Sequence, residues 1–573
     1  MSAAGGAVWE PLGPFGGPAE YVVTSPSTPQ LVLAGSPNSL LFRSRDGGAA
    51  WQHLAFPAEL ASSLHVILPH PTDERQWLAG VSPDSGGSGL FFSRDGGDSW
   101  EPRPFFAGKA VWAIAHFPGD PRVMVLGASD GIYRSNDGGG MWQRISPLQD
   151  ENLKPVVSVA FDPAKPEVIY AGTPHLPWKT SDGGTRWQSI HTGMSDDSDV
   201  FSIHVDRDDP ERVYASACSG IYRSLSAGRL WAKLRGAADA SFRTYIISRD
   251  PHEKQHVWAG TTHGLMLSVD GGTIWRTVAR HSVKSIAFDP RARGTLYLAT
   301  RDAGLQKSTD GGKTFQAINR GYANRSFFAL AAVRSALWLA GEGTGLMQSA
   351  DAGKSWAKAT VSPAERVLMI AACQGSSTLF AGGAGFLRSA AATATAAPAP
   401  WRALSEPRRE PVRSVACEGG GATIVAASSR AAYSSADAGR SWTALSAGET
   451  AAAGMEWNQI AVSAAPGGTW LAGTSHGLLR SVDQGRSWQR AAAGELATAT
   501  VASVIAHPGR SGHAFAAQYN QVFLSTDDGR SWRPLTTAGL NRGVVRALAI
   551  LPEAPNRLFA LVAGRGVFVT ELE

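Results

Sequence analysis

The sequence is poor in cysteine and contains no long apolar run. Three of its 573 residues are cysteine, Cys218, Cys373 and Cys417, and they form no metal-ligand spacing, so no bound metal is expected. Disulfide stabilisation is not expected either, and Cys373 and Cys417, at comparable places in neighbouring repeats, are interpreted as small buried core residues. No apolar run approaches the roughly 20 residues of a membrane helix. These scarcities predict a soluble protein with no membrane span.

An excess of charge of one sign is also lacking. The net charge is +5 and both signs are interspersed, which is too dilute to indicate nucleic acid or an anionic membrane as a partner. Residues 1–8 lack the basic-then-apolar order of a secretory signal. The chain as given is therefore expected to be cytoplasmic, and secreted or periplasmic if a leader was removed.

What the sequence does contain is glycine, proline and a recurring motif. The 64 glycines and 33 prolines fit many short strands and turns. Ser93-Arg94-Asp95-Gly96-Gly97-Asp98-Ser99-Trp100 returns at intervals of roughly 40 to 50 residues. The other clear copies are 44–51, 135–142, 268–275, 308–315, 349–356, 435–442, 481–488 and 525–532, and weaker copies are 180–187 and 224–231.

The motif predicts a hairpin turn with a packing anchor. Its aspartate can accept hydrogen bonds from backbone N–H groups, and the glycine two residues later supplies a positive φ. The tryptophan then opens the next strand. This S-x-D-x-G-x-x-W pattern resembles the Asp-box, or BNR, repeat of the β-propellers of sialidases, sortilin-type receptors, xyloglucanase-type glycoside hydrolases and photosystem II assembly factors. The resemblance implies a propeller and leaves function open, because these families do different things.

Between two boxes the sequence predicts one propeller blade. Residues 156–161 form an apolar run suited to an inner strand, 162–166 a turn and 168–172 a second strand. The third strand leads into the box at Thr180, and the fourth starts at Trp187. Four antiparallel strands in ~44 residues make a blade.

The number of fourth-strand openers gives the number of blades. Thirteen residues occupy this position: Trp9, Trp51, Trp100, Trp142, Trp187, Trp231, Trp275, Phe315, Trp356, Trp401, Trp442, Trp488 and Trp532. Trp9 lacks three preceding strands and the strand at 566–570 lacks a fourth, so the two termini are expected to complete one blade. The prediction is an all-β fold of tandem propellers with about thirteen blades, split seven plus six, with domains at 1–315 and 316–573.

The recurring box aspartates invite an enzymatic interpretation, but so many equivalent groups indicate a structural role. Each turn offers one carboxylate, whereas calcium needs six to eight oxygens, so no calcium site is expected. The box aspartates are Asp46, Asp95, Asp137, Asp182, Asp270, Asp310, Asp351, Asp437, Asp483 and Asp527.

Two loops that lead into inner strands carry acidic residues that could serve catalysis. A glycosidase needs two carboxyl groups across a sugar, ~5 to 5.5 Å apart if retaining and ~6.5 to 9.5 Å apart if inverting. A solvated acidic rim is the alternative interpretation. The candidates are Asp150, Glu151, Asp196, Asp197 and Asp199.

One position of the inner strand changes character along the chain. It holds Trp112, Phe201 and Tyr245, and later Lys284, Arg413 and Arg546. Alternation in a strand sends this position to one face. If that face is the channel, the aromatic residues offer stacking surfaces and the cations an anion-attracting mouth. The alternative is packing between blades for the aromatic residues and exposure for the cations.

The active sites of the resembled enzymes do not carry over. Residues 21–26 hold no Arg-Ile-Pro motif of the sialidase type, and Arg45-Asp46-Gly47-Gly48 stands where xyloglucanase-type enzymes show Asp-Val-Gly-Gly. Sortilin-like receptors add a cysteine-rich segment and an anchor, which the chain as given lacks. The expectation is a non-catalytic binding or scaffold protein with a protein or carbohydrate ligand and no cofactor. The alternative is a glycoside hydrolase that acts in a cleft between the propellers.

Overall fold

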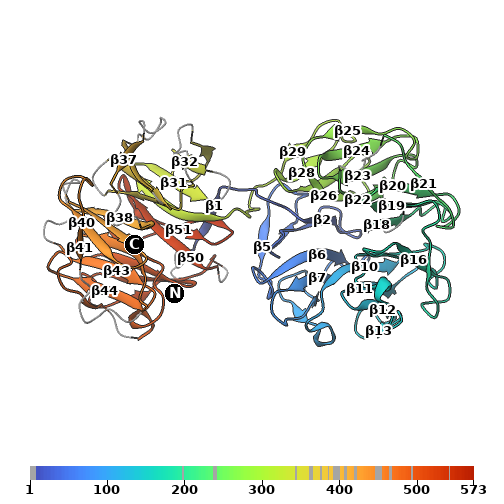
Figure 1. Ribbon diagram of the computed structural model, residues 1–573, viewed down its shortest axis with the longest axis horizontal. Helices are drawn as coiled ribbons and strands as arrows, with labels where there is room; N and C mark the ends of the chain where they lie inside the picture. The colour runs from blue at the N-terminus through green and yellow to red at the C-terminus, as the bar shows by residue number, and fades with distance from the viewer. Residues whose placement is uncertain are drawn as a thin grey trace, which may run out of the picture. The chain divides into compact units, whose positions relative to one another are not determined.

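The computed structural model describes most of the chain. The described residues are 8–195, 199–236, 242–341, 345–359, 366–373, 377–384, 386–391, 401–405, 410–418, 423–445, 454–463, 468–491, 494–540 and 543–572. They form thirteen four-stranded antiparallel sheets, each a propeller blade, and two compact units, Gly16–Asn324 and Met1–Phe15 with Arg325–Glu573. The prediction of an all-β tandem propeller with thirteen blades is confirmed (Figure 1).

The unit Gly16–Asn324 contains seven blades and is called the seven-bladed unit. Its strands are, for blade 1, β2 (Tyr21–Thr24), β3 (Val32–Gly35), β4 (Leu41–Ser44) and β5 (Gln52–Leu54); for blade 2, β6 (Ser62–Pro69), β7 (Trp77–Pro83), β8 (Leu90–Ser93) and β9 (Glu101–Pro102); for blade 3, β10 (Val111–Phe117), β11 (Asp120–Ala128), β12 (Gly131–Ser135) and β13 (Gln143–Arg144); for blade 4, β14 (Ser158–Phe161), β15 (Ile169–Gly172), β16 (Pro177–Thr180) and β17 (Gln188–Ser189); for blade 5, β18 (Val200–Val205), β19 (Val213–Ala217), β20 (Gly220–Ser224) and β21 (Trp231–Lys233); for blade 6, β22 (Thr244–Arg249), β23 (Val257–Thr261), β24 (Gly264–Ser268) and β25 (Arg276–Ala279); for blade 7, β26 (Val283–Phe288), β27 (Leu296–Thr300), β28 (Gly304–Ser308) and β29 (Gln316–Ala317).

The other unit contains six blades and is called the six-bladed unit. Its strands are, for blade 8, β30 (Phe327–Val333), β31 (Ala336–Gly341), β32 (Gly345–Ser349) and β33 (Ala357–Lys358); for blade 9, β34 (Met369–Ala372), β35 (Thr378–Gly383), β36 (Phe386–Ala391) and β37 (Arg402–Leu404); for blade 10, β38 (Val412–Glu418), β39 (Thr423–Ser428), β40 (Ala432–Ser435) and β41 (Thr443–Leu445); for blade 11, β42 (Trp457–Val462), β43 (Trp470–Thr474), β44 (Gly477–Ser481) and β45 (Gln489–Arg490); for blade 12, β46 (Ser503–Ala506), β47 (Ala514–Gln518), β48 (Gln521–Ser525) and β49 (Arg533–Pro534); for blade 13, β50 (Val545–Leu551), β51 (Ala554–Val562), β52 (Gly566–Glu571) and β1 (Glu10–Gly13). Three short 3₁₀ turns, η1 (Pro104–Phe106), η2 (Glu151–Leu153) and η5 (Gly494–Ala497), lie in loops.

The unit boundaries differ from the expected 1–315 and 316–573. Residues 1–15 belong with the C-terminal unit, because β1 pairs with β52 in the register Glu10↔Val569. The seven-bladed unit extends to Asn324, because the Tyr322 hydroxyl donates to the carbonyl of Pro18 at 2.6 Å. The prediction that the two termini share one blade is confirmed.

The core lies between neighbouring blades rather than within one. The second strand of each blade is buried on both faces, as in β15, where all four residues of Ile169–Gly172 are buried. Between blades 4 and 5, Tyr170 packs in one cluster with Ile203 and Trp231. Each blade therefore depends on its neighbours for burial of apolar surface, which explains the continuous apolar runs of the second strands.

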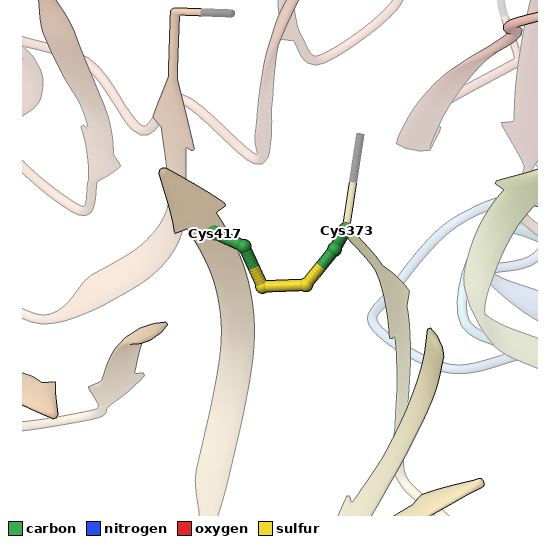
Figure 2. Close-up of a disulfide and its surroundings, with 2 residues drawn as sticks. All are labelled: Cys373 and Cys417. Atoms are coloured by element: carbon green, nitrogen blue, oxygen red, sulfur yellow. A yellow bond between two sulfur atoms is a disulfide. The ribbon is translucent and has the colours of Figure 1, made fainter. Parts of the chain in front are cut away.

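The expectation that no disulfide forms is wrong. Cys373, just after β34, and Cys417, in β38, form a disulfide between neighbouring blades, with Cα atoms 5.1 Å apart (Figure 2). Both are buried, as expected. The pairing arises because comparable positions on inner strands of adjacent blades lie side by side, within disulfide reach. Cys218 is free and exposed.

Candidate functional site

The Asp box is a closed hydrogen-bonded turn. The Ser93 hydroxyl donates to Asp95 Oδ1 at 2.9 Å and accepts from the N–H of Gly97 at 2.8 Å. Asp95 Oδ1 also accepts from the N–H of Ser99 at 2.9 Å. Gly97 has a backbone φ of +90°, which residues other than glycine rarely adopt. The same three bonds hold the turns of all ten box aspartates.

The hydrogen-bonding role of the serine in the box was not predicted from the sequence. Ser93 is 1% exposed and joins the carboxylate to the buried N–H of Gly97, whereas the groups around Asp95 face solvent. The signal was present, since a serine or threonine opens every box. In the box that lacks aspartate, the Ser226 hydroxyl accepts from the N–H of Leu230 at 3.1 Å and holds the same turn.

These hydrogen bonds lower the pKa of every box aspartate. The hydroxyl of Ser487 lowers the pKa of Asp483 to about 2, with further help from backbone N–H groups, and Ser531 does the same for Asp527. A carboxylate held ionised by its own turn is a poor general acid at neutral pH. Its chemistry suits a structural role.

The box tryptophans anchor the turns in two ways. Trp100 Nε1 donates within its own box to the carbonyl of Gly97 at 3.1 Å. Trp51 Nε1 instead donates to the carbonyl of Ile318 at 2.6 Å, in the neighbouring blade 7. The indole N–H thus forms a hydrogen bond either within its own turn or with the preceding blade.

Two of the acidic loop residues make local contacts within their own loop. Asp150 caps η2 by accepting from the N–H of Asn152 at 3.1 Å, and Glu151 pairs with Lys154 at 2.8 Å. Asp199 is half-buried ahead of β18, and Asp196 and Asp197 lie outside the described residues. Asp150, Glu151 and Asp199 are not among the residues that line the channel described next.

Four sequence-predicted residues do meet in the channel of the seven-bladed unit. Trp112, Phe201, Tyr245 and Lys284 line one cavity of about 680 Å³. Its wall is built by the inner strands of all seven blades, β2, β6, β10, β14, β18, β22 and β26. The alternating register of these strands positions the four side chains, because equivalent positions of successive blades face one axis.

Cations and aromatic rings alternate on part of this wall. Lys284 Nζ lies 2.6 Å from Glu20 Oε1 and 4.0 Å from the centre of the Tyr245 ring. The Arg243 guanidinium lies 4.2 Å from the Phe201 ring centre, and that of Arg301 lies 5.5 Å from the Tyr245 ring centre. Sequence reasoning missed Glu20, Arg243 and Arg301, which lie just outside the ends of strands, beyond the strand register.

Burial lowers the pKa of two groups in this channel. It lowers the pKa of Lys284, which Glu20 partly restores. It also lowers the pKa of His65 to about 4, with Lys284 adding to the shift. His65 is therefore neutral at physiological pH, and its Nε2 lies 2.7 Å from the hydroxyl of Ser82.

Arg413 and Arg546 do not form a corresponding site. Arg413 pairs with Glu456 at 2.8 Å on the surface, and Arg546 is exposed. The channel of the six-bladed unit holds a cavity of about 100 Å³ lined mainly by apolar inner-strand residues, and neither arginine is part of that lining.

The described residues form neither a metal-ligand cluster nor a membrane-spanning helix. Among the residues that the structure describes, no cluster of three or more His, Cys, Asp or Glu could hold a metal ion. No helix there is long and apolar enough to cross a membrane.

Comparison with known proteins agrees with this architecture. Residues 108–387 match the family model described as photosynthesis system II assembly factor YCF48. No curated protein sequence matches the chain. Similar solved structures include the GH74 xyloglucanase of Xanthomonas campestris, with 17% identity, a TM-score of 0.74, and coverage of 99% of this chain and 100% of that one. Another is the GH74 enzyme of Niastella koreensis, with 15% identity, a TM-score of 0.70 and coverage of 98% and 99%.

A third similar structure has a different role. PorZ of Porphyromonas gingivalis, a bacterial surface component of the type-IX secretion system, has 12% identity, a TM-score of 0.57 and coverage of 98% and 87%. At these identities the likeness concerns the fold. Together with the ten Asp boxes and thirteen blades, the comparisons show a β-propeller fold whose repeats are similar to Asp-box (BNR) repeats.

Proposed function

We propose that the chain is a non-catalytic binding protein that takes a protein or carbohydrate ligand in the channel of the seven-bladed unit. The observation that carries this proposal is the convergence of Trp112, Phe201, Tyr245 and Lys284 on one cavity of about 680 Å³. Concave sites with aromatic walls and a few placed polar groups are where small ligands bind.

The carboxyl groups of this channel support binding over hydrolysis. Of the residues that line the cavity, Glu20 alone carries a carboxyl group, and its Oε1 is held by Lys284 at 2.6 Å. A glycosidase of the usual kind uses two carboxyl groups on either side of the scissile bond. The described lining of this cavity offers no second one.

A glycoside hydrolase is the second candidate function. The full-length similarity to the GH74 xyloglucanase of Xanthomonas campestris favours it, although that similarity concerns the fold. Its acids would come from Asp150, Glu151 and Asp199, and from Asp196 and Asp197 outside the described residues.

Binding and hydrolysis can be measured on the same materials. The wild-type chain is immobilised and exposed to a panel of neutral and acidic polysaccharides and to a lysate of the native host, and release of reducing ends is followed. We expect retention of a polysaccharide or a protein without release of reducing ends. Trp112→Ala and Tyr245→Ala should abolish retention, whereas Phe105→Ala, a change at an exposed ring outside the cavity, should preserve it.

Two results would overturn the proposal. Release of reducing ends that disappears in Asp150→Asn or Glu151→Gln would identify a hydrolase. Retention that persists in both channel variants would show that the ligand binds elsewhere.

A further inference from the structure

The channel of the seven-bladed unit carries more positive than negative charge. Lys284, Arg243 and Arg301 line the cavity with one carboxylate, Glu20, and that carboxylate is paired with Lys284. Among the described residues, no carboxylate forms an ion pair with the guanidinium of Arg243 or Arg301, and both groups lie over aromatic rings. Two arginines that pair with no described carboxylate in a concave site favour an anion.

The order of the blades places these charges on one side of the channel. Inner strands contact one another in sequence from β2 to β26, and β26 contacts β2, so the seven blades form a closed ring. Arg243 immediately precedes β22 of blade 6, and Lys284 and Arg301 belong to blade 7. Trp112 is on blade 3, three blades from blade 6 and three from blade 7. The indole therefore lies across the channel from the cations.

This arrangement fits a ligand whose ring has one broad face and one charged edge. Arginine presents paired N–H donors whose geometry matches a carboxylate, and a half-buried indole offers a broad face. Lys284 and Glu20, side by side, add a donor and an acceptor for hydroxyl groups. A cavity of about 680 Å³ is of the size that holds a small ligand.

Building on the proposed function, we infer that the channel binds a carboxylate-bearing sugar, a uronic acid residue, free or within an acidic oligosaccharide. Its carboxylate contacts Arg243 and Arg301, and its ring lies toward Trp112. A neutral sugar would leave both guanidinium groups without a counter-charge. An acidic peptide would satisfy them without needing the indole, which makes the indole the discriminating group.

The test compares ligands that differ only in charge. Calorimetric titrations use digalacturonic acid, diglucuronic acid and the methyl esters of both, with an acidic hexapeptide as a further probe. We expect at least one of the acids to bind. Its methyl ester should bind at least about tenfold more weakly, because hydrogen bonds to charged groups are stronger than those to neutral groups. Affinity for the acid should fall as sodium chloride is raised.

The variants assign the contacts. Arg243→Gln and Arg301→Gln should each weaken binding of the acid about tenfold and leave binding of the ester unchanged. Trp112→Ala should weaken both. Arg413→Gln, a surface arginine outside this unit, is the matched control and should change neither. Thermal unfolding of each variant verifies that the fold is retained.

Three outcomes overturn the inference. Equal affinity for acid and ester would make charge irrelevant, and binding of the peptide in place of both acids would make the partner a protein. If neither acid binds but the chain retains a neutral polysaccharide, and Trp112→Ala abolishes that retention, the acidic sugar is refuted and the proposed function stands. Binding that no channel variant affects would refute both.

Discussion

The two units close their rings in different ways. In the six-bladed unit β1 from the N-terminus completes blade 13 by pairing with β52. In the seven-bladed unit each blade is continuous in the chain. Side chains join blades 7 and 1, as when Thr24 Oγ1 donates to the carbonyl of Phe288 at 2.7 Å and Lys307 Nζ to that of Gly47 at 2.8 Å. One ring is closed by a strand from the other end of the chain that completes a blade, and the other by packing and hydrogen bonds between two complete blades, including Ala19 N–H to the carbonyl of Thr300 at 2.8 Å.

The two channels differ as much as the closures. The cavity of the six-bladed channel is about 100 Å³ and is lined mainly by apolar residue types, and the Cys373–Cys417 disulfide joins blades 9 and 10. The cavity of the seven-bladed channel is about 680 Å³ and carries cations and aromatic rings. The same blade thus builds a tightly packed ring in one unit and an open, polar channel in the other.

Removal of residues 1–13 should have the largest effect and should be confined to the six-bladed unit. It deletes β1 and the buried Trp9, and it leaves the edge of β52 without a partner. The loss of stability should exceed the ~3–5 kcal/mol of a single buried tryptophan. Differential scanning calorimetry should show the six-bladed transition greatly lowered and the seven-bladed one unchanged. Equal shifts of both transitions would contradict separate closure.

Trp100→Ala should act on the other unit. Trp100 is 7% exposed and packs with Phe56 and Trp77, so its loss should cost ~3–5 kcal/mol. Because each blade contacts chiefly its neighbours, only the seven-bladed transition should fall. Trp488→Ala, at the equivalent place in blade 11, is the reciprocal variant and should lower only the six-bladed transition. An unchanged midpoint with lost ligand binding would mean that the box is a functional site.

The disulfide should stabilise only the six-bladed unit. Cys373 and Cys417 are 44 residues apart in the chain, and a bridge of this kind typically contributes ~2–4 kcal/mol. Cys373→Ala with Cys417→Ala should lower the six-bladed transition accordingly, and Cys218→Ala, at the exposed free cysteine, should change neither. A thiol titration of the unfolded wild type should find one free thiol. Three free thiols would refute the pairing.

Periodicity made most of the fold predictable. The recurring boxes, the four strands between them and the unpaired ends define thirteen blades and a shared terminal blade. The expected domain bounds still placed residues 1–15 in the first unit, although the shared terminal blade that the same pattern predicts puts β1 beside β52 in the second unit. Periodicity also missed the disulfide, since a spacing of one repeat brings two inner-strand residues together only once the blades are stacked.

The site was predictable only where it follows strand register. Alternation identified Trp112, Phe201, Tyr245 and Lys284 as residues that share one face, and the structure places all four on one cavity wall. Arg243 and Arg301 lie just outside the strands, where no periodicity reports direction. Arg413 and Arg546 occupy the same repeat position and are exposed, and neither is part of the lining of the smaller cavity in the six-bladed unit.

Ser93→Ala should have a smaller effect than loss of the tryptophan, and a larger one than Asp95→Ala. The Ser93 hydroxyl satisfies the buried N–H of Gly97, and a buried donor without a partner costs ~1–3 kcal/mol. The N–H group that Asp95 accepts from is exposed, so water can replace the carboxylate in Asp95→Ala. Calorimetry of both variants should show the seven-bladed transition lowered more by Ser93→Ala. The reverse order would assign the main role in the turn to the carboxylate.

Acid should produce the smallest difference between the units, and it should favour the six-bladed one. A carboxyl group whose pKa is lower in the folded chain than in the unfolded one contributes stability above the unfolded value of about 4. That contribution is lost as the pH falls through the folded pKa, which is about 2 for Asp483 and Asp527.

The number of such groups sets the sign of the difference. Six box aspartates with lowered pKa lie in the seven-bladed unit, Asp46, Asp95, Asp137, Asp182, Asp270 and Asp310, and four lie in the six-bladed unit, Asp351, Asp437, Asp483 and Asp527. Asp73, Asp120 and Asp208, all in the seven-bladed unit, add to this excess. Between about pH 4 and pH 2 the seven-bladed transition should therefore fall faster. Replacing its six box aspartates by asparagine should reduce the gap, and a faster fall of the six-bladed transition in the wild type would show that other groups control acid stability.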